Sequence, residues 1–279
     1  MVRKYTLFSS VILAAGMFST PAGAAAFSFT TGAPDGRIAL ASRPGAMGIL
    51  EIEAADDFIL PTATRLTSAT FIGLLPADLA LSNINFVGVE IYRVFPLDSV
   101  NPPSGNVPTR VNSPSDNAFD SRDTTAGDLA FTTSVLNSLF STSNSILNGI
   151  NKSPNQTTGG EGATSGEEVQ FNVTFTNPLL LPAGHYFFVP QVGLPANDNF
   201  FWLSTTGPPQ FTGDLQAWIR NGNLDPDWLR AGTDIVGGTA KFDQAFSLAG
   251  DPVPEPASMT LVLGGLAGLL YKRFRHVRP

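Results

Sequence analysis

The residues best suited to holding a ligand alternate along one short segment near the end of the chain. Trp218 lies between Gln216 and Arg220, and in a strand these three side chains share one face. An indole stacks on a sugar ring, while an amide and a guanidinium reach its hydroxyls, so the three are candidate glycan contacts. Two structural interpretations compete: Arg220 stacks on Trp218 beneath a helix that begins at Asp225, or residues 215–220 form a helix with Trp218 in its apolar stripe. We favour the structural interpretations.

Two carboxylates and one imidazole are candidates for catalysis. Glu51 and Glu53 are two residues apart, which in a strand places them on one face at about 7 Å, a spacing compatible with a glycosidase pair. Alternating carboxylates are also common on exposed strand faces. His185 opens a strongly apolar segment, and the sequence has no G-x-S-x-G motif, so we expect a structural histidine rather than a general base. The sequence predicts no catalytic residue and no enzyme.

A cation site is the third possibility. Four residues are spaced like positions 1, 3, 5 and 12 of an EF-hand loop: Asn223, Asp225, Asp227 and Asp234. Trp228 stands where such a loop requires glycine. The same segment suits a short helix capped by Asp225, with Pro226 in its first turn and Gly232 at its end. We therefore predict capping rather than metal binding here and assign no cofactor, while calcium at another aspartate-rich loop stays open.

The segments that must position these residues are short and separated by Gly, Pro, Asn and Asp. In residues 169–175 apolar side chains share one face and polar ones the other, as in an antiparallel sheet with one buried face. Further strands are predicted at 49–52, 69–73, 86–94, 185–189, 200–203 and 242–248. Many strands without regular helices between them predict an all-β fold: an antiparallel β-sandwich or jelly-roll-like single domain over residues 25–251.

Residues 101–168 interrupt this pattern. Polar stretches rich in Pro, Ser, Asn, Thr and Gly lie at 101–127 and 151–168. Between them, apolar residues recur at near-helical spacing from Leu129 to Ile150. We predict a long excursion of loop and helix packed on one side of the sandwich, although the many Ser, Thr and Asn residues lower helix propensity.

Composition restricts the class of partner. The chain has 279 residues and no cysteine, which excludes disulfides, so its stability must come from an apolar core. Of its 16 Lys and Arg residues, two lie in 1–24 and four in 252–279, whereas all 23 Asp and Glu residues lie between those ends or at Glu255. Without residues 1–24, and if the tail is cut near Pro256 and Glu255 is retained, 10 cations remain against 23 carboxylates, a net charge of about −13. Such a charge repels phosphate backbones and anionic headgroups, so we predict no nucleic-acid or peripheral membrane binding.

The first 24 residues are typical of a secretory signal peptide. Arg3 and Lys4 precede an apolar segment from Leu7 to Phe18. Small residues follow, and Ala22-Gly23-Ala24 matches the A-x-A cleavage pattern. The exported domain is therefore expected to begin at or near Ala25.

The last residues, 252–279, have the features of a second sorting segment. Pro254-Glu255-Pro256 leads into an apolar segment at 257–271, and a basic end follows at 272–279. As a helix the apolar segment would be about 22 Å long, shorter than a hydrocarbon core of about 30 Å, so we expect a short transmembrane helix that is later removed. Its basic end, with Lys272, Arg273 and Arg275, should stay cytoplasmic.

This tail resembles the PEP-CTERM signal of bacterial exosortase substrates, with Pro254-Glu255-Pro256 as the signature. Ala55-Asp56-Asp57-Phe58, Val89-Glu90-Ile91-Tyr92 and the segment 245–250 look like parts of the β-sandwich ectodomains common in that family. The resemblance implies export from a diderm bacterium by Sec-type machinery, and processing by exosortase during inner-membrane transit. It also implies membrane contact only through the transient tail, and a final place at the cell surface or outside the cell.

Two functions follow from these features. The absence of catalytic motifs favours a non-catalytic protein of the envelope or extracellular matrix. The alternative is a carbohydrate-binding module acting on exopolysaccharide, which the sandwich fold and Gln216, Trp218 and Arg220 favour.

Overall fold

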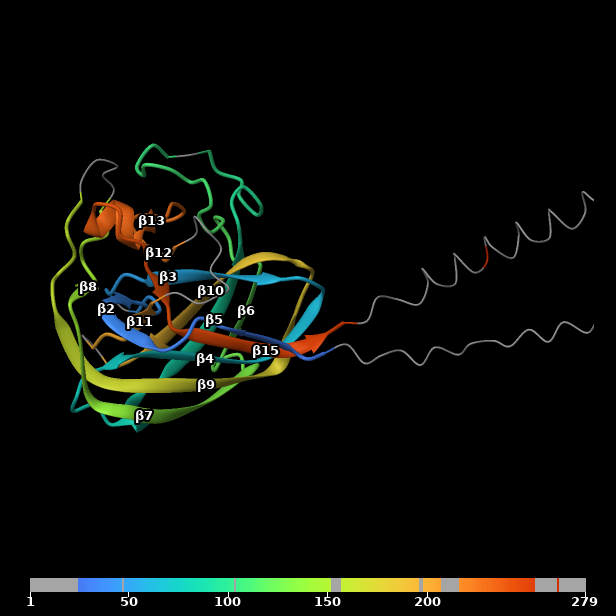
Figure 1. The fold of residues 1–279 in the computed structure, drawn as a ribbon, viewed down its shortest axis with the longest axis horizontal. Coiled ribbons are helices and arrows are strands. Elements are labelled where there is room, and N and C mark those ends of the chain that lie inside the picture. Colours follow the sequence, from blue (N-terminus) through green and yellow to red (C-terminus); the bar gives the residue numbers. More distant parts are fainter. Residues whose placement is uncertain are drawn as a thin grey trace, which may run out of the picture.

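The structure, a computed structural model, describes residues 25–253 except 47, 103, 152–156, 196–197 and 207–215, together with Gly265. Most of this part of the chain forms two β-sheets (Figure 1). The first sheet contains nine strands: β1 (Phe27–Thr30), β2 (Pro34–Ala41), β4 (Thr64–Leu75), β7 (Leu129–Thr142), β8 (Asn144–Ile146), β9 (Thr164–Leu181), β11 (Phe201–Thr205), β14 (Asp243–Gln244) and β15 (Phe246–Pro252). The second contains six: β3 (Ile52–Leu60), β5 (Phe86–Arg93), β6 (Asp120–Asp123), β10 (Gly184–Gly193), β12 (Trp218–Asn221) and β13 (Leu229–Arg230).

The predicted all-β class is confirmed, with one mixed and one antiparallel sheet. In the first sheet β8 pairs parallel with β2 and the other pairings are antiparallel. In the second, β10 lies between β3 and β5, and β12 lies on the other side of β3. Two short helical turns, η1 (Leu81–Asn83) and η2 (Ala231–Val236), join strands of the two sheets. The jelly-roll-like connectivity stays a prediction.

The two sheets pack face to face around an aromatic core. Phe188 of β10 stacks on Phe246 of β15 across the interface, with ring centroids 5.1 Å apart. Within the first sheet Phe71 of β4 stacks on Phe171 of β9 at 4.8 Å, and Phe200 meets Phe71 edge-on at 5.7 Å. All five rings are buried. In a chain without cysteine, this packing holds the two sheets together.

Six predicted strands are confirmed. Residues 69–73, 86–93, 169–175, 185–189 and 201–203 lie in β4, β5, β9, β10 and β11, and 242–248 falls on β14 and β15. In β9 the predicted alternation holds, since Val169, Phe171 and Val173 are buried. The strand predicted at 49–52 is wrong except for its last residue, because β3 begins at Ile52 and runs to Leu60.

The helix predicted between Leu129 and Ile150 is wrong. This segment forms β7, which pairs with β9, and β8, which pairs with β2. The register between β7 and β9 shifts twice within residues 135–140, which interrupts the two-residue alternation and imitates helical spacing. Leu136 and Leu139 are 50% and 64% exposed, so part of the apparent apolar stripe faces solvent. The predicted excursion therefore adds strands to both sheets rather than a helix.

The described domain begins and ends at the same edge of the first sheet. β1 pairs antiparallel with β15, and Phe27 lies opposite Gly250, so the chain enters β1 where it leaves β15 (Figure 1). The predicted signal peptide, 1–24, and the sorting residues from Pro254 onward lie outside the described residues. Within the described residues, no helix has the length and apolar character needed to cross a membrane.

Candidate functional site: a buried arginine cluster and an aspartate triad

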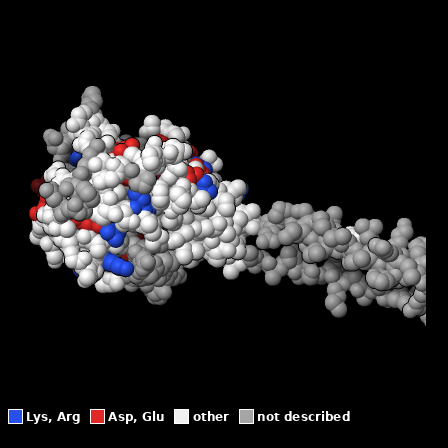
Figure 2. Space-filling model, turned by 90° about the horizontal axis from the view of Figure 1, so that it is seen from above, with Lys and Arg blue, Asp and Glu red and all other residues white. Residues whose placement is uncertain are grey.

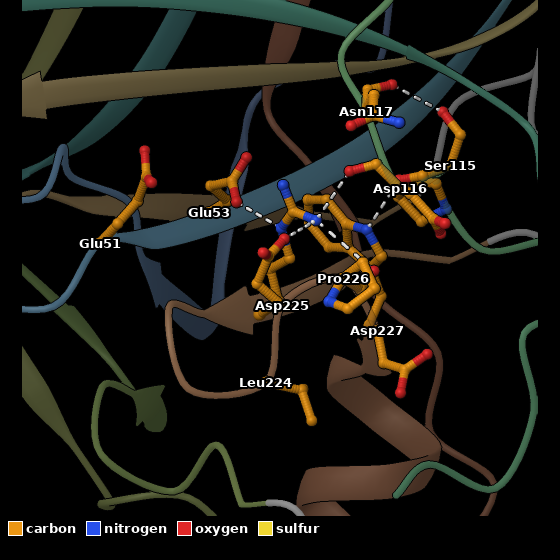
Figure 3. A network of polar contacts seen from close by, with 12 residues as sticks. Glu51, Glu53, Ser115, Asp116, Asn117, Leu224, Asp225, Pro226 and Asp227 are labelled. Atoms are coloured by element: carbon orange, nitrogen blue, oxygen red, sulfur yellow. Dashed lines mark hydrogen bonds and ion pairs between the residues drawn. The ribbon is translucent and has the colours of Figure 1, made fainter. Parts of the chain in front are cut away.

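An arginine lies at the centre of a polar network on the face of the second sheet that points away from the core (Figure 3). Arg220 of β12 pairs with Glu53 of β3 and donates to the Tyr92 hydroxyl of β5 at 2.9 Å. It also forms an ion pair with Asp225 at 2.8 Å. Its Cζ lies 4.3 Å from the ring centroid of Trp228, which covers the guanidinium. Burial alone would lower the pKa of Arg220, but the Glu53 carboxylate raises it, so the arginine stays charged.

A second arginine ties the loop between β5 and β6 to the same face. Arg110 forms buried ion pairs with Asp116 of that loop and with Asp227. Trp228 Nε1 donates to the backbone oxygen of Ser115 at 3.2 Å. Buried ion pairs, with residues from this loop and from the segment after β12, thus hold the first half of the predicted excursion over β12.

The three candidate glycan residues lie inside this packing. Trp218, Gln216 and Arg220 are 1%, 2% and 5% exposed. Of the strand and helix interpretations of this segment, the strand holds for Trp218–Asn221, which form β12, and Trp218 belongs to a small apolar cluster with Trp228. The stack predicted between Arg220 and Trp218 is wrong in its partner, because the guanidinium lies over Trp228 and Tyr92 instead. In this arrangement the Trp218 indole presents no stacking face to a sugar in solvent.

Glu51 and Glu53 have separate partners. Glu53 is 5% exposed and pairs with Arg220, whereas Glu51 accepts a hydrogen bond from Gln191 Nε2 at 2.8 Å. Burial raises the pKa of Glu51, and the hydrogen bond from Gln191 lowers it in part. The carboxylate that shares a hydrogen-bond partner with Glu53 is Glu90, through Tyr92. Glu53 is therefore held in a structural ion pair.

The residues with EF-hand spacing do not converge on one point. Their carboxylates pair with three different arginines: Asp225 with Arg220, Asp227 with Arg110 and Asp234 with Arg230. The dispersal of these carboxylates agrees with the prediction that they do not form an EF-hand site.

The short helix predicted from Asp225 to Gly232 is wrong. Residues 222–226 form a turn, because the Asn221 side chain accepts the backbone N–H groups of Asn223 and Leu224, each at 3.1 Å. The Asp225 carboxylate is engaged with Arg220 and does not cap a helix. Helical geometry begins only at η2, six residues later.

Tyr92 lies between two carboxylates that compete for its one proton. Its hydroxyl oxygen is 2.7 Å from Glu53 Oε1 and 2.7 Å from Glu90 Oε2. A phenol donates only one hydrogen bond, so the second contact is satisfied when Glu90 itself carries a proton. Burial raises the pKa of Glu90 to about 7, and the Glu53 charge adds to this effect.

Replacing Glu90 with Gln is expected to raise the free energy of unfolding over that of the wild type by more at pH 8 than at pH 5. In the wild type the protonated Glu90 favours folding fully below a pH of about 4.5, and this contribution is lost as the pH rises through about 7. Gln keeps a hydrogen-bond donor at every pH. The difference in free energy of unfolding between Glu90→Gln and the wild type should therefore shift in favour of the variant by on the order of 2 kcal/mol from pH 5 to pH 8. Urea unfolding at both pH values measures this. Asp78→Asn, at an exposed position, is the control, and an equal difference at both pH values would contradict the assignment.

Three aspartates form a second buried polar cluster, which the sequence did not predict as a site. Asp56 and Asp57 of β3 and Asp243 of β14 each place one carboxylate oxygen within 4.8 Å of the other two. We call them the aspartate triad; they are 1%, 8% and 7% exposed. His185 Nε2 lies 2.8 Å from Asp57 Oδ2, which agrees with the structural role expected for this histidine. The available signal was an adjacent pair of aspartates with apolar residues on both sides, Ala54-Ala55 before and Phe58-Ile59 after.

A pocket of about 480 Å³ lies next to the triad. Asp57 lines it together with apolar residues from β1 and β3, including Phe27, Phe29 and Phe58. The pocket is at the edge of the domain where β1 begins and β15 ends, since Ala25 and Pro252 also line it. Asp57 is thus the triad residue nearest to solvent in this pocket.

No known family model matches this chain, and no curated protein or solved structure does. What the protein does is therefore indicated by its own residues. These are the terminal sequence segments, the buried arginines and the aspartate triad.

Proposed function

We propose that this chain is an exported, non-catalytic protein of the bacterial envelope or extracellular matrix, sorted by exosortase through a PEP-CTERM tail. The order of features in residues 252–279 carries the proposal. Pro254-Glu255-Pro256 is followed by an apolar segment too short for a lasting anchor, and then by Lys272, Arg273 and Arg275. The signal-peptide pattern in residues 1–24 supports the same route.

The arrangement of the folded domain supports such processing. Because β1 and β15 are neighbours, removal of both terminal segments would release the domain from one edge and leave every strand pairing in place. Acidic and basic side chains lie interspersed on the face seen in Figure 2, most of which is uncharged. Such a surface gives no extended basic area for a nucleic-acid backbone on this face.

The buried charged groups support a structural role. Arg220 forms an ion pair with Glu53 and Arg110 forms ion pairs with Asp116 and Asp227, and an aromatic ring lies over each guanidinium. Buried ion pairs of this kind fix loops and strands in one arrangement. The carbohydrate-binding alternative depends on Trp218, and its 1% exposure makes this the weaker proposal.

Mass spectrometry of the protein recovered from its native host tests the sorting proposal. The extracellular species should begin at or near Ala25 and lack residues 272–279. Replacing Lys272, Arg273 and Arg275 with Ser should let the chain pass the inner membrane without retention and should reduce processing. The matched control exchanges the same residues between Lys and Arg and keeps the charge. Recovery of an intact C-terminus on extracellular wild-type protein would overturn the proposal.

A further inference from the structure

The aspartate triad has the spacing of ligands around one cation. Two oxygens bound to the same Ca²⁺ at 2.3–2.6 Å lie at most about 5 Å apart. One oxygen from each of Asp56, Asp57 and Asp243 lies within 4.8 Å of the other two. A single ion placed among them would therefore contact all three carboxylates with small side-chain adjustments.

Asp56 provides a separate indication that the cluster binds a ligand. Its Oδ2 accepts the backbone N–H of Gln244 at 2.6 Å, but its Oδ1 is fully buried and has no hydrogen-bond partner among the described residues. The side chain is 1% exposed, so bulk solvent does not reach it. A buried carboxylate oxygen without a partner is strongly unfavourable unless a proton or a cation meets it.

The electrostatics of the cluster also favour a cation. Burial raises the pKa of Asp56 well above its usual range, and the charges of Asp243 and Asp57 raise it further. Burial raises the pKa of Asp243 to about 7, with further contributions from Asp57 and Asp35, while Lys241 opposes them. Three buried carboxylates this close together repel one another, and a divalent cation placed between them neutralises two of these charges at once.

The pocket beside the triad gives access. Asp57 lines both the cluster and the pocket of about 480 Å³, which has room for the water molecules that complete a coordination shell. His185 lies on β10, the antiparallel neighbour of β3, and its Nε2 is 2.8 Å from Asp57 Oδ2. This contact orients the Asp57 carboxylate in the way that outer hydrogen bonds orient metal ligands.

We propose that Asp56, Asp57 and Asp243 bind one calcium ion. The ligand set consists of oxygen atoms from carboxylates, which is what calcium prefers, and calcium tolerates an irregular shell of six to eight ligands where magnesium demands an octahedron. The ion joins β3 of the second sheet to β14 of the first, directly before β15. It therefore links the two sheets just before the last strand begins.

Calorimetric titration of the full chain with CaCl₂ after treatment with EDTA tests the proposal. We expect one site with a dissociation constant of about 10⁻⁴ M, in the range of extracellular calcium modules. In 10 mM CaCl₂ the midpoint of thermal unfolding should rise by about 5–10 °C over the calcium-free protein.

Variants separate calcium binding from a merely structural cluster. Asp243→Asn and Asp56→Asn remove buried like charges, so both proteins should melt at or above the calcium-free wild type, and both should lose the calcium response. Asp251→Asn, at an exposed position on β15, should keep the full response. A wild type that neither binds nor is stabilised by calcium would overturn the proposal. So would an equal response to 10 mM MgCl₂, or a calcium response that survives Asp243→Asn.

Discussion

Replacing Arg220 with Met is expected to lower the free energy of unfolding by about 3–5 kcal/mol, because it leaves Glu53 as a buried charge without its partner. The change also removes the hydrogen bond to Tyr92 and the contact with the Trp228 ring. Methionine fills much of the same volume, so a cavity accounts for little of the effect. Urea unfolding at pH 7, followed by tryptophan fluorescence and by circular dichroism, measures the loss.

Three variants separate the ion pair from packing. Arg65→Met removes an exposed arginine of β4 and should change stability by less than about 0.5 kcal/mol. Arg220→Lys keeps the charge but loses the planar fork, so its loss should be smaller than that of Arg220→Met. Adding Glu53→Gln to Arg220→Met should recover part of the stability, since the orphaned charge is gone. Arg220→Met with the stability of wild type would show that the network contributes nothing to folding.

Truncating Phe71 to Ala is expected to lower the free energy of unfolding by about 3–5 kcal/mol. Phe71 is fully buried and contacts the rings of Phe171, Phe200 and Phe188. These neighbours belong to several strands and cannot all close over the cavity. Thermal and urea unfolding both report the change, and the dependence on urea concentration should stay that of the wild type.

Leu180→Ala is the control for the loss of Phe71. Leu180 lies in β9 and is 60% exposed, so its truncation should cost less than about 1 kcal/mol. Phe71→Leu keeps most of the apolar volume and should fall between the two. A loss below 1 kcal/mol for Phe71→Ala would mean that the stacked aromatic rings are not the stabilising centre of the interface.

The strands were predictable where one face is buried and the other is wet. In β9 apolar and polar side chains alternate over Val169–Phe175, so the two-residue period shows directly in the sequence. β3 was harder because both of its faces are buried: Ala54 packs in the core, while Glu53 and Asp57 meet other buried polar groups. A strand covered on both sides has no alternation to detect.

The clusters depend on contacts that the sequence does not encode locally. Arg220 and Glu53 are 167 residues apart in the chain, and the hydrogen bond from Gln244 to Asp56 spans 188 residues. The sequence predicted Arg220 as a glycan contact or as the partner of Trp218 in a stack, whereas its guanidinium lies over Trp228. The sequence could not show this, because Trp228 reaches the guanidinium only through the turn that Asn221 organises.

The order in which the domain can fold follows from the position of β15 between β1 and β4. The hydroxyl of Thr31, just after the first strand, bonds to the backbone of Phe246, 215 residues later. The first sheet therefore cannot close before almost the whole chain has been synthesised, and such non-local pairing is slow. Under the export route proposed above, this delay would keep the chain unfolded while it crosses the membrane, because β1 has no strand partner until β15 has been synthesised.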